Sequence, residues 1–143
     1  MESLFVMAQV APTEYPKDNL EKADSLVKDA AEKYHPGMII FPETFMSRFP
    51  AGTDIATANA VAEPLDGEFV QGMKKLAADH DVWLTFGMKE TIEDPADHRC
   101  YNTVVKEITR EKSYRLTEKR IYMMRSDTRN PMSIKLETSS LSQ

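Results

Sequence analysis

Apolar and mixed stretches alternate along the chain and divide it into predicted strands and helices. Leu4 to Val10 is a short apolar run, which predicts a buried strand. From Leu20 to Tyr34 apolar residues recur at helical spacing, which predicts an amphipathic helix with Asp18 or Asn19 as its cap. The continuous apolar run Met38 to Phe41 predicts a strand that is buried on both faces.

The alternation continues through the next part of the chain. Residues 45–60 predict a loop that leads into a short helix, and residues 66–68 begin a second amphipathic helix. A third strand is predicted at residues 82–87 and a fourth at 101–105, paired with the third. A strand–helix–strand unit makes its strands parallel neighbours, so the order predicts a layered α/β domain.

Composition limits the class of protein. A chain of 143 residues with 41% apolar residues can bury one small core. The net charge of -5, without a basic stripe, argues against nucleic acid as a partner. No apolar run approaches the roughly 20 residues that cross a membrane. The first residues, 1–8, carry an acidic rather than a basic group, which argues against a secretory signal and predicts a cytoplasmic protein.

Cysteine and histidine give little sign of a metal site. Cys100 is the single cysteine, which excludes an internal disulfide and a multi-cysteine zinc site. His35, His80 and His98 are scattered without the spacing of metal ligands, so we expect them at the surface or in turns. The sequence therefore predicts no bound metal.

The candidate for chemistry is Glu43, which follows the apolar run 38–41 directly after Pro42. Ligands of open α/β sheets bind at the carboxyl ends of the strands. A carboxylate there is expected to be partly desolvated, which would raise its pKa and suit it to general-base catalysis. From physics alone, a solvated or helix-capping glutamate is the simpler interpretation.

Several stretches resemble the nitrilase superfamily of carbon–nitrogen hydrolases in order and spacing. They are Val6–Thr13, Lys17–Leu20, Ile39–Glu43, Pro64–Gly67, Ala77–Gly87 and Tyr101–Val105. The resemblance implies an α/β fold, a truncated portion of the nitrilase-type α-β-β-α four-layer sandwich. It also implies a Glu-Lys-Cys triad that needs no cofactor. In this triad the thiol attacks an amide, carbamoyl or nitrile carbon and forms a thioester, which water then hydrolyses.

The resemblance gives Glu43 the role of general base, and the other two triad members lack clear counterparts. The family nucleophile follows a later strand than the one after Cys100, so we interpret Cys100 as a half-buried strand-edge residue. Lys119 is the candidate for the family's catalytic lysine, but it lies one register away from that lysine's place, which would turn a strand side chain to the opposite face. A solvated lysine is the alternative. Phe45 and Met46, just after Glu43, are candidates for a substrate pocket, with simple packing as the alternative.

The end of the chain departs from the family pattern. We predict that residues 1–105 form the amino-terminal part of the hydrolase domain and that 106–143 are an atypical, poorly ordered tail. Overlapping codons from Arg110 onward can spell the family's lysine strand, so we interpret the tail as the product of a reading-frame change near residues 106–109. The face that the family's second half covers would then be exposed, which favours self-association as a homo-oligomer.

The sequence thus predicts a member of the carbon–nitrogen hydrolase family that acts on a small-molecule amide, carbamoyl or nitrile substrate. Without the cysteine nucleophile, we expect this chain to be a truncated and inactive form. Two alternatives stay open. The chain could be a natural short isoform that associates with a full-length relative, or an unrelated small-molecule-binding α/β domain.

Overall fold

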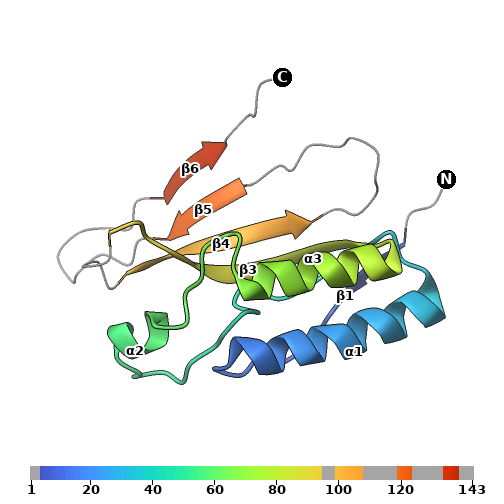
Figure 1. Cartoon of the computed structure of the whole chain (residues 1–143), viewed down its shortest axis with the longest axis horizontal. Helices are drawn as coiled ribbons and strands as arrows, with labels where there is room; N and C mark the ends of the chain where they lie inside the picture. The colour runs from blue at the N-terminus through green and yellow to red at the C-terminus, as the bar shows by residue number, and fades with distance from the viewer. Residues whose placement is uncertain (1–3, 95–98, 108–118, 124–133, 139–143) are drawn as a thin grey trace.

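The computed structural model describes residues 4–94, 99–107, 119–123 and 134–138. Its elements are β1 (Phe5–Met7), α1 (Pro16–Tyr34), β2 (Met38–Ile40), α2 (Ile55–Asn59), α3 (Glu68–His80), β3 (Trp83–Thr91), β4 (Cys100–Glu107), β5 (Lys119–Met123) and β6 (Ile134–Thr138). The six strands form one sheet in sequence order, from β1 to β6 (Figure 1). The predicted α/β class is confirmed.

The sheet is mixed, and its first half is parallel as the crossover argument predicted. β1 pairs with β2 and β2 with β3 in parallel, with Ile39 beside both Val6 and Leu84. β3 then turns back into β4, and these two strands pair antiparallel over eight residues, from Leu84 opposite Glu107 to Thr91 opposite Cys100. The predicted pairing of the third and fourth strands is therefore confirmed.

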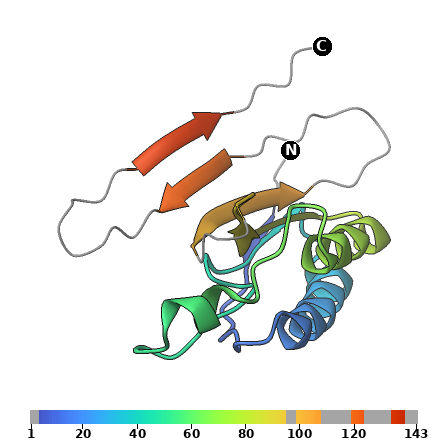
Figure 2. The same ribbon diagram turned by 60° about the vertical axis from the view of Figure 1, so that its left-hand side comes forward.

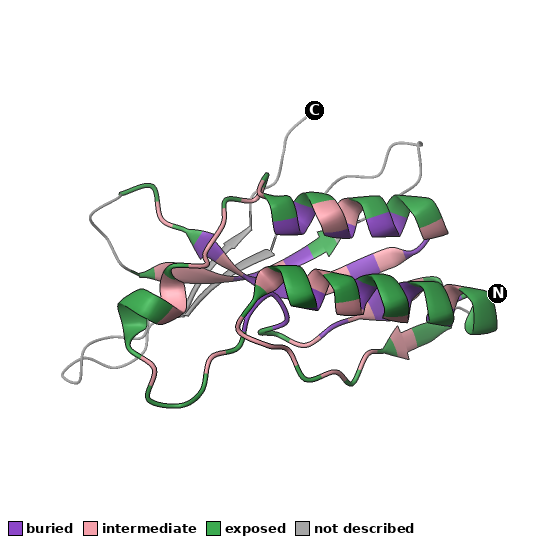
Figure 3. Cartoon of the chain, turned by 60° about the horizontal axis from the view of Figure 1, so that its bottom comes forward, coloured by how far each residue is buried: buried purple, intermediate pink, exposed green. Residues whose placement is uncertain are grey.

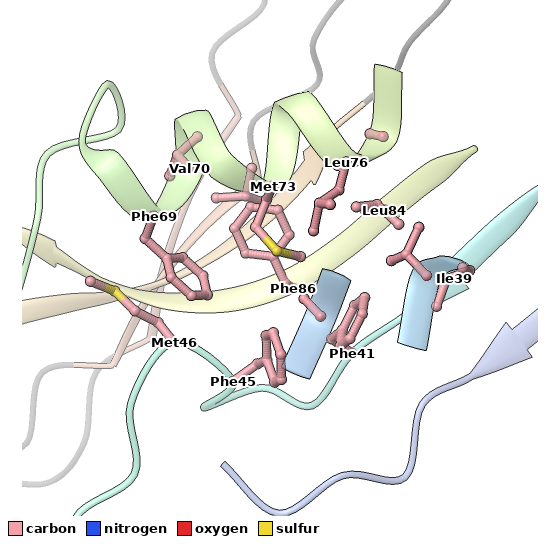
Figure 4. Packing of buried hydrophobic residues seen from close by; sticks show 14 of the residues in the cluster. Ile39, Phe41, Phe45, Met46, Phe69, Val70, Met73, Leu76, Leu84 and Phe86 are labelled. Carbon is pink, nitrogen blue, oxygen red and sulfur yellow. The ribbon is translucent and has the colours of Figure 1, made fainter. Parts of the chain in front are cut away.

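Helices α1 and α3 lie on the same side of the sheet (Figures 1 and 2). Their buried residues form stripes on the helices (Figure 3), as expected from their amphipathic sequences. Between helices and sheet, Phe41, Phe45, Phe69 and Phe86 form a chain of ring contacts, with neighbouring centroids 4.4 to 6.1 Å apart. Figure 4 shows these rings packed together in the core.

The opposite face of the parallel strands is covered by neither α1 nor α3. Phe5 and Met7 of β1 are 57% and 77% exposed, so the predicted buried first strand is wrong. Ile39 is buried, but Met38 and Ile40 are only partly buried, which corrects the prediction that β2 is buried on both faces. Side chains alternate between the faces of a strand, and here the two helices pack on only one of those faces.

Helix α1 begins at Pro16, earlier than the sequence suggested. The residue before it, Tyr15, is the cap and provides no side-chain capping bond, so neither Asp18 nor Asn19 has the predicted role. Proline suits the first helical position because that position needs no N–H donor. Asn19 therefore lies inside the helix, where it is fully buried.

The predicted short helix and second amphipathic helix are both present. Asp54 caps α2 by accepting a hydrogen bond from the Thr57 backbone N–H at 2.9 Å. Glu63 accepts from the backbone N–H of Phe69 in the first turn of α3, at 2.8 Å.

Within the described part of the chain, no helix combines the length and the apolar character needed to cross a membrane.

The carboxyl-terminal tail contributes two further strands to the sheet. Lys119 pairs with Val104 of β4, and β5 pairs with β6 over five residues. The remainder of the predicted poorly ordered tail, residues 108–118, 124–133 and 139–143, lies outside the described residues, so its order stays a prediction.

Candidate active site

Glu43 lies just past the carboxyl end of β2, where the sequence predicted it. The strand ends at Ile40, and the chain stays beside β3 for one more residue because the Phe41 N–H donates to the Thr85 carbonyl at 2.8 Å. It then turns, and the Phe45 N–H donates to the Pro42 carbonyl at 3.2 Å. This turn presents Glu43 at the edge where parallel strands end.

Gly87 allows the turn to lie directly against β3. A Cβ at position 87 would fall 1.3 Å from the Glu43 carbonyl oxygen and 2.2 Å from its carbon. Gly87 also holds both ends of the turn, since its N–H donates to Pro42 at 3.3 Å and its carbonyl accepts from Met46 at 3.0 Å. The absence of a side chain at 87 therefore sets the position of the Glu43 backbone.

The Glu43 carboxylate is held by Asn102, whose Nδ2 donates to Oε1 at 2.6 Å. Asn102 is paired with Lys89, whereas the neighbouring Phe86 and Met88 of β3 are buried in the core. By strand alternation, Asn102 therefore points to the face opposite α1 and α3. Glu43 is exposed, so the predicted partial desolvation of its carboxylate is wrong.

Asn19 fixes the far side of the same loop. Its Nδ2 donates to the carbonyls of Met46 and Thr13, both at 2.9 Å, and its Oδ1 accepts from the Thr13 N–H at 2.8 Å. The fully buried amide thus ties α1 to the segment that follows Glu43. From sequence, Asn19 was only a candidate cap and a member of the family-like stretch Lys17–Leu20, and nothing in the pattern of a single helix indicates such a long-range contact.

A pocket of about 610 Å³ has Thr44 and Asn102 in its wall, the first next to Glu43 in sequence and the second bonded to it, but Glu43 itself does not line it. Such a volume is within the usual range for small-molecule sites. Of the two predicted pocket residues, Met46 lines it and Phe45 does not. Phe45 is fully buried and packs on Phe41, because the turn after Glu43 directs its ring into the core.

Lys89 and Cys100 lie together in the pocket wall. The Lys89 ammonium donates to the Ala58 carbonyl of α2 and lies 4.9 Å from the centre of the Phe49 ring. Burial lowers the pKa of Lys89, and the nearby Cys100 raises it slightly. The Cys100 thiol donates to Asn59 Oδ1 at 3.2 Å, and burial raises its pKa, with a smaller opposing effect of Lys89. A half-buried thiol of this kind is a poor nucleophile, in agreement with the predicted strand-edge role.

The other residues that the sequence singled out are Lys119 and the three histidines. Lys119 begins β5, with its backbone beside Val104, and its side chain lies outside the described residues. His35 is exposed at the end of α1 and His80 lies in the last turn of α3, while His98 is outside the described residues. Among the described residues, no three His, Cys, Asp or Glu side chains are grouped as a metal site would require.

Comparison with protein families gives a match to the model described as carbon-nitrogen hydrolase, over residues 7–131. The matched range extends beyond Val105, the last residue of the stretches that resemble the family in sequence. A search of curated proteins found no match.

Solved structures share the fold. Nit3 from Saccharomyces cerevisiae, a nitrilase superfamily member, aligns with TM-score 0.62 and 20% identity over 83% of this chain and 44% of its own. A CN-hydrolase superfamily protein from Xanthomonas campestris aligns with a TM-score of 0.59 and 23% identity, over 76% of this chain and 37% of its own. The NitN amidase from Neterenkonia sp. AN1 aligns with a TM-score of 0.57 and 17% identity, over 75% of this chain and 40% of its own. The chain thus spans less than half the length of these structures.

Proposed function

The chain belongs to the carbon–nitrogen hydrolase family, and from that premise we propose that it supplies the general base, Glu43, for hydrolysis of a small non-peptide C–N bond. The observation that carries the proposal is the Glu43–Asn102 pair at the carboxyl ends of the parallel strands, beside a pocket of ligand size. Asn102 engages one carboxylate oxygen and leaves the other to accept a proton.

The reaction requires two further groups beside this base. A thiolate, formed as Glu43 takes the thiol proton, attacks the amide carbon, and the developing oxyanion is stabilised by a lysine ammonium. Amine or ammonia leaves with a proton returned by Glu43, and water then hydrolyses the thioester. Lys119 is our candidate for the lysine because its backbone neighbours Val104, two residues from Asn102.

The nucleophile is not Cys100. Its thiol is bonded to Asn59, its pKa is raised by burial, and its strand position precedes that of the family nucleophile. We therefore propose that these 143 residues alone are inactive and that the nucleophile comes from residues outside them. Loss of one member of a cooperating triad removes most of its rate enhancement.

The test combines DNA sequence with an ammonia-release assay. The coding DNA is translated in all frames past codon 143, and any longer product is assayed on small amides beside the 143-residue chain. We expect activity only in the longer product, with Glu43→Gln lowering kcat by about 10²–10⁴-fold and the exposed Glu21→Gln leaving it unchanged. Absence of a lysine strand and a cysteine strand in every frame would remove the frame-change explanation. Activity of the 143-residue chain that Cys100→Ser abolishes would refute the assigned nucleophile.

One observation favours the non-catalytic alternative, in which the chain associates with a full-length relative. The sheet face opposite the helices exposes Phe5 and Met7, and Glu43 lies on that side. Exposed apolar faces of this kind favour association. If the chain acts in this way, Met7→Lys should weaken its co-sedimentation with a full-length relative, while Tyr34→Lys, at the end of α1, should not.

A further inference from the structure

Residues 49–62, called here the α2 segment, connect the Glu43 turn to the chain before α3 and contain the short helix α2 (Figures 1 and 2). Backbone hydrogen bonds fix the chain at both ends of this segment. The Arg48 N–H donates to the Thr13 carbonyl at 2.8 Å, and the Glu63 N–H donates to the Lys89 carbonyl at 3.1 Å. The α2 segment is therefore an excursion between two fixed points.

Between these points the α2 segment has little attachment to the core. Among the described residues, its backbone–backbone hydrogen bonds all stay within the segment, as from Ala58 to Asp54 and from Ala62 to Asn59, both at 3.0 Å. None of its residues is buried, and Ile55 is 63% exposed. Parts of a protein with few buried apolar contacts can open without unfolding of the rest.

Two side chains of the sheet hold the α2 segment in place. The Lys89 ammonium, from β3, donates to the Ala58 carbonyl and lies 4.9 Å from the centre of the Phe49 ring. The Cys100 thiol, from β4, donates to Asn59 Oδ1 at 3.2 Å. Single contacts of these kinds are weak in water, so they can break and form again while the core stays intact.

The α2 segment is also a wall of the pocket. Residues 49–53, Ile55, Ala58 and Asn59 line it, and the ends of β3 and β4 contribute further lining residues, Lys89 and Cys100 among them. Movement of the segment would therefore change the width of the pocket. Glu43 and Asn102 lie outside the segment, so their hydrogen bond does not have to break in such a movement.

We propose that the α2 segment is a lid that opens and closes the pocket as one unit, with Lys89 and Cys100 as its latch. The structure shows the closed state, in which both latch residues contact the segment. In the open state these contacts are broken and a small ligand can enter. Lids of this kind move in microseconds to milliseconds. The inference requires the pocket but not C–N hydrolysis, so it stands apart from the proposed function.

The test is ¹⁵N relaxation dispersion on the intact 143-residue chain, which detects a minor state populated at about 0.1–10%. The amides of residues 49–62 should share one exchange rate and one open-state population, because the lid moves as a unit. The amides of β2 and α3 should show no exchange at that rate.

Variants of the latch should change that population. Cys100→Ala removes the thiol donor, which is a weak one, and should raise the open-state population by about three- to fivefold. Cys100→Ser retains a donor to Asn59 and should return the population to that of the native chain. Phe49→Leu removes the ring beside the Lys89 ammonium and should raise the population by about two- to fivefold. Lys89 itself is left unchanged, because its charge also acts on the Cys100 thiol.

Lys106→Met is the matched control. The Lys106 ammonium lies 4.7 Å from the centre of the Trp83 ring, at the opposite end of β3, so the variant removes a lysine–aromatic contact away from the latch. Its open-state population should equal that of the native chain. Thermal unfolding checks that each variant is folded, and Phe49→Leu decides the point if Cys100→Ala does not fold.

The outcomes separate the lid from the proposed hydrolase function. Equal open-state populations in Cys100→Ala and Cys100→Ser, or a different exchange rate for each amide of residues 49–62, would overturn the lid. Absence of exchange in both Cys100→Ala and Phe49→Leu would do the same. One shared rate that responds to both latch variants, together with a longer product that hydrolyses no amide, would preserve the lid and refute the hydrolase.

Discussion

Replacement of Gly87 by alanine tests whether the close approach of β3 to the Glu43 turn supports the fold and the site. The added methyl would lie 1.3 Å from the Glu43 carbonyl oxygen, against an ordinary contact of about 3.5 Å, so the backbone would have to retreat by about 2 Å. The obstacle is backbone rather than a flexible side chain, and no rotamer change can relieve it.

The magnitude follows from the contacts that such a retreat would break. The two hydrogen bonds of Gly87, to Pro42 and from Met46, contribute about 1 kcal/mol each. Overpacking adds about 1–3 kcal/mol. We therefore expect Gly87→Ala to lower the free energy of unfolding by about 3–5 kcal/mol.

Urea unfolding followed by circular dichroism measures this loss, and Gly37→Ala is the matched control. A Cβ at position 37 would meet only the Leu4 carbonyl oxygen, at 3.9 Å. Both substitutions remove the same backbone freedom from the unfolded chain, so their difference isolates the collision with Glu43. In a folded fraction of Gly87→Ala, the side-chain amide resonances of Asn102 should also shift as its bond to Glu43 is lost. Equal stabilities of the two variants would refute the reasoning.

The remaining predictions concern the buried amide and the thiol. Asn19→Ala should lower the free energy of unfolding by about 2–4 kcal/mol in the same urea assay, because it leaves Thr13 and Met46 backbone groups without partners; a loss below about 1 kcal/mol would contradict this account. Cys100 should react with iodoacetamide only at higher pH than in the urea-unfolded chain, because burial raises its pKa and lowers the thiolate fraction. Lys89→Met removes the opposing charge, so alkylation of Cys100 should become slower still; an unchanged or faster reaction would refute the effect of the Lys89 charge on the thiol.

Local sequence patterns predicted most of the elements but not their limits. Periodicity indicated α1, α3 and the first four strands, since an amphipathic face and an apolar run are visible in consecutive residues. It placed the start of α1 at Leu20 instead of Pro16, because a proline and three polar or charged residues concealed the first turn. It also assigned burial to Met7, which is 77% exposed, since hydrophobicity alone does not say which face of a strand is covered.

At the candidate site, too, the sequence identified some features and missed others. The position of Glu43 after an apolar strand, together with the family motifs, identified it from sequence. Its partner Asn102 is 59 residues away, and the sequence indicated Asn102 only as part of the family-like stretch Tyr101–Val105. The pocket was not visible either, because its lining residues come from separate loops and strands.

The sequence by itself determined the class of fold, the parallel order of the first strands and the place of Glu43, since each depends on neighbours along the chain. Only the tertiary structure decided that Glu43 is exposed and held by Asn102, that Phe45 belongs to the core, and that Gly87 must lack a side chain. The physical reason is that burial, hydrogen bonding and close approach arise between segments that are distant in sequence. The position of Glu43 thus depends on Gly87 and Asn102, which are distant from it in the sequence.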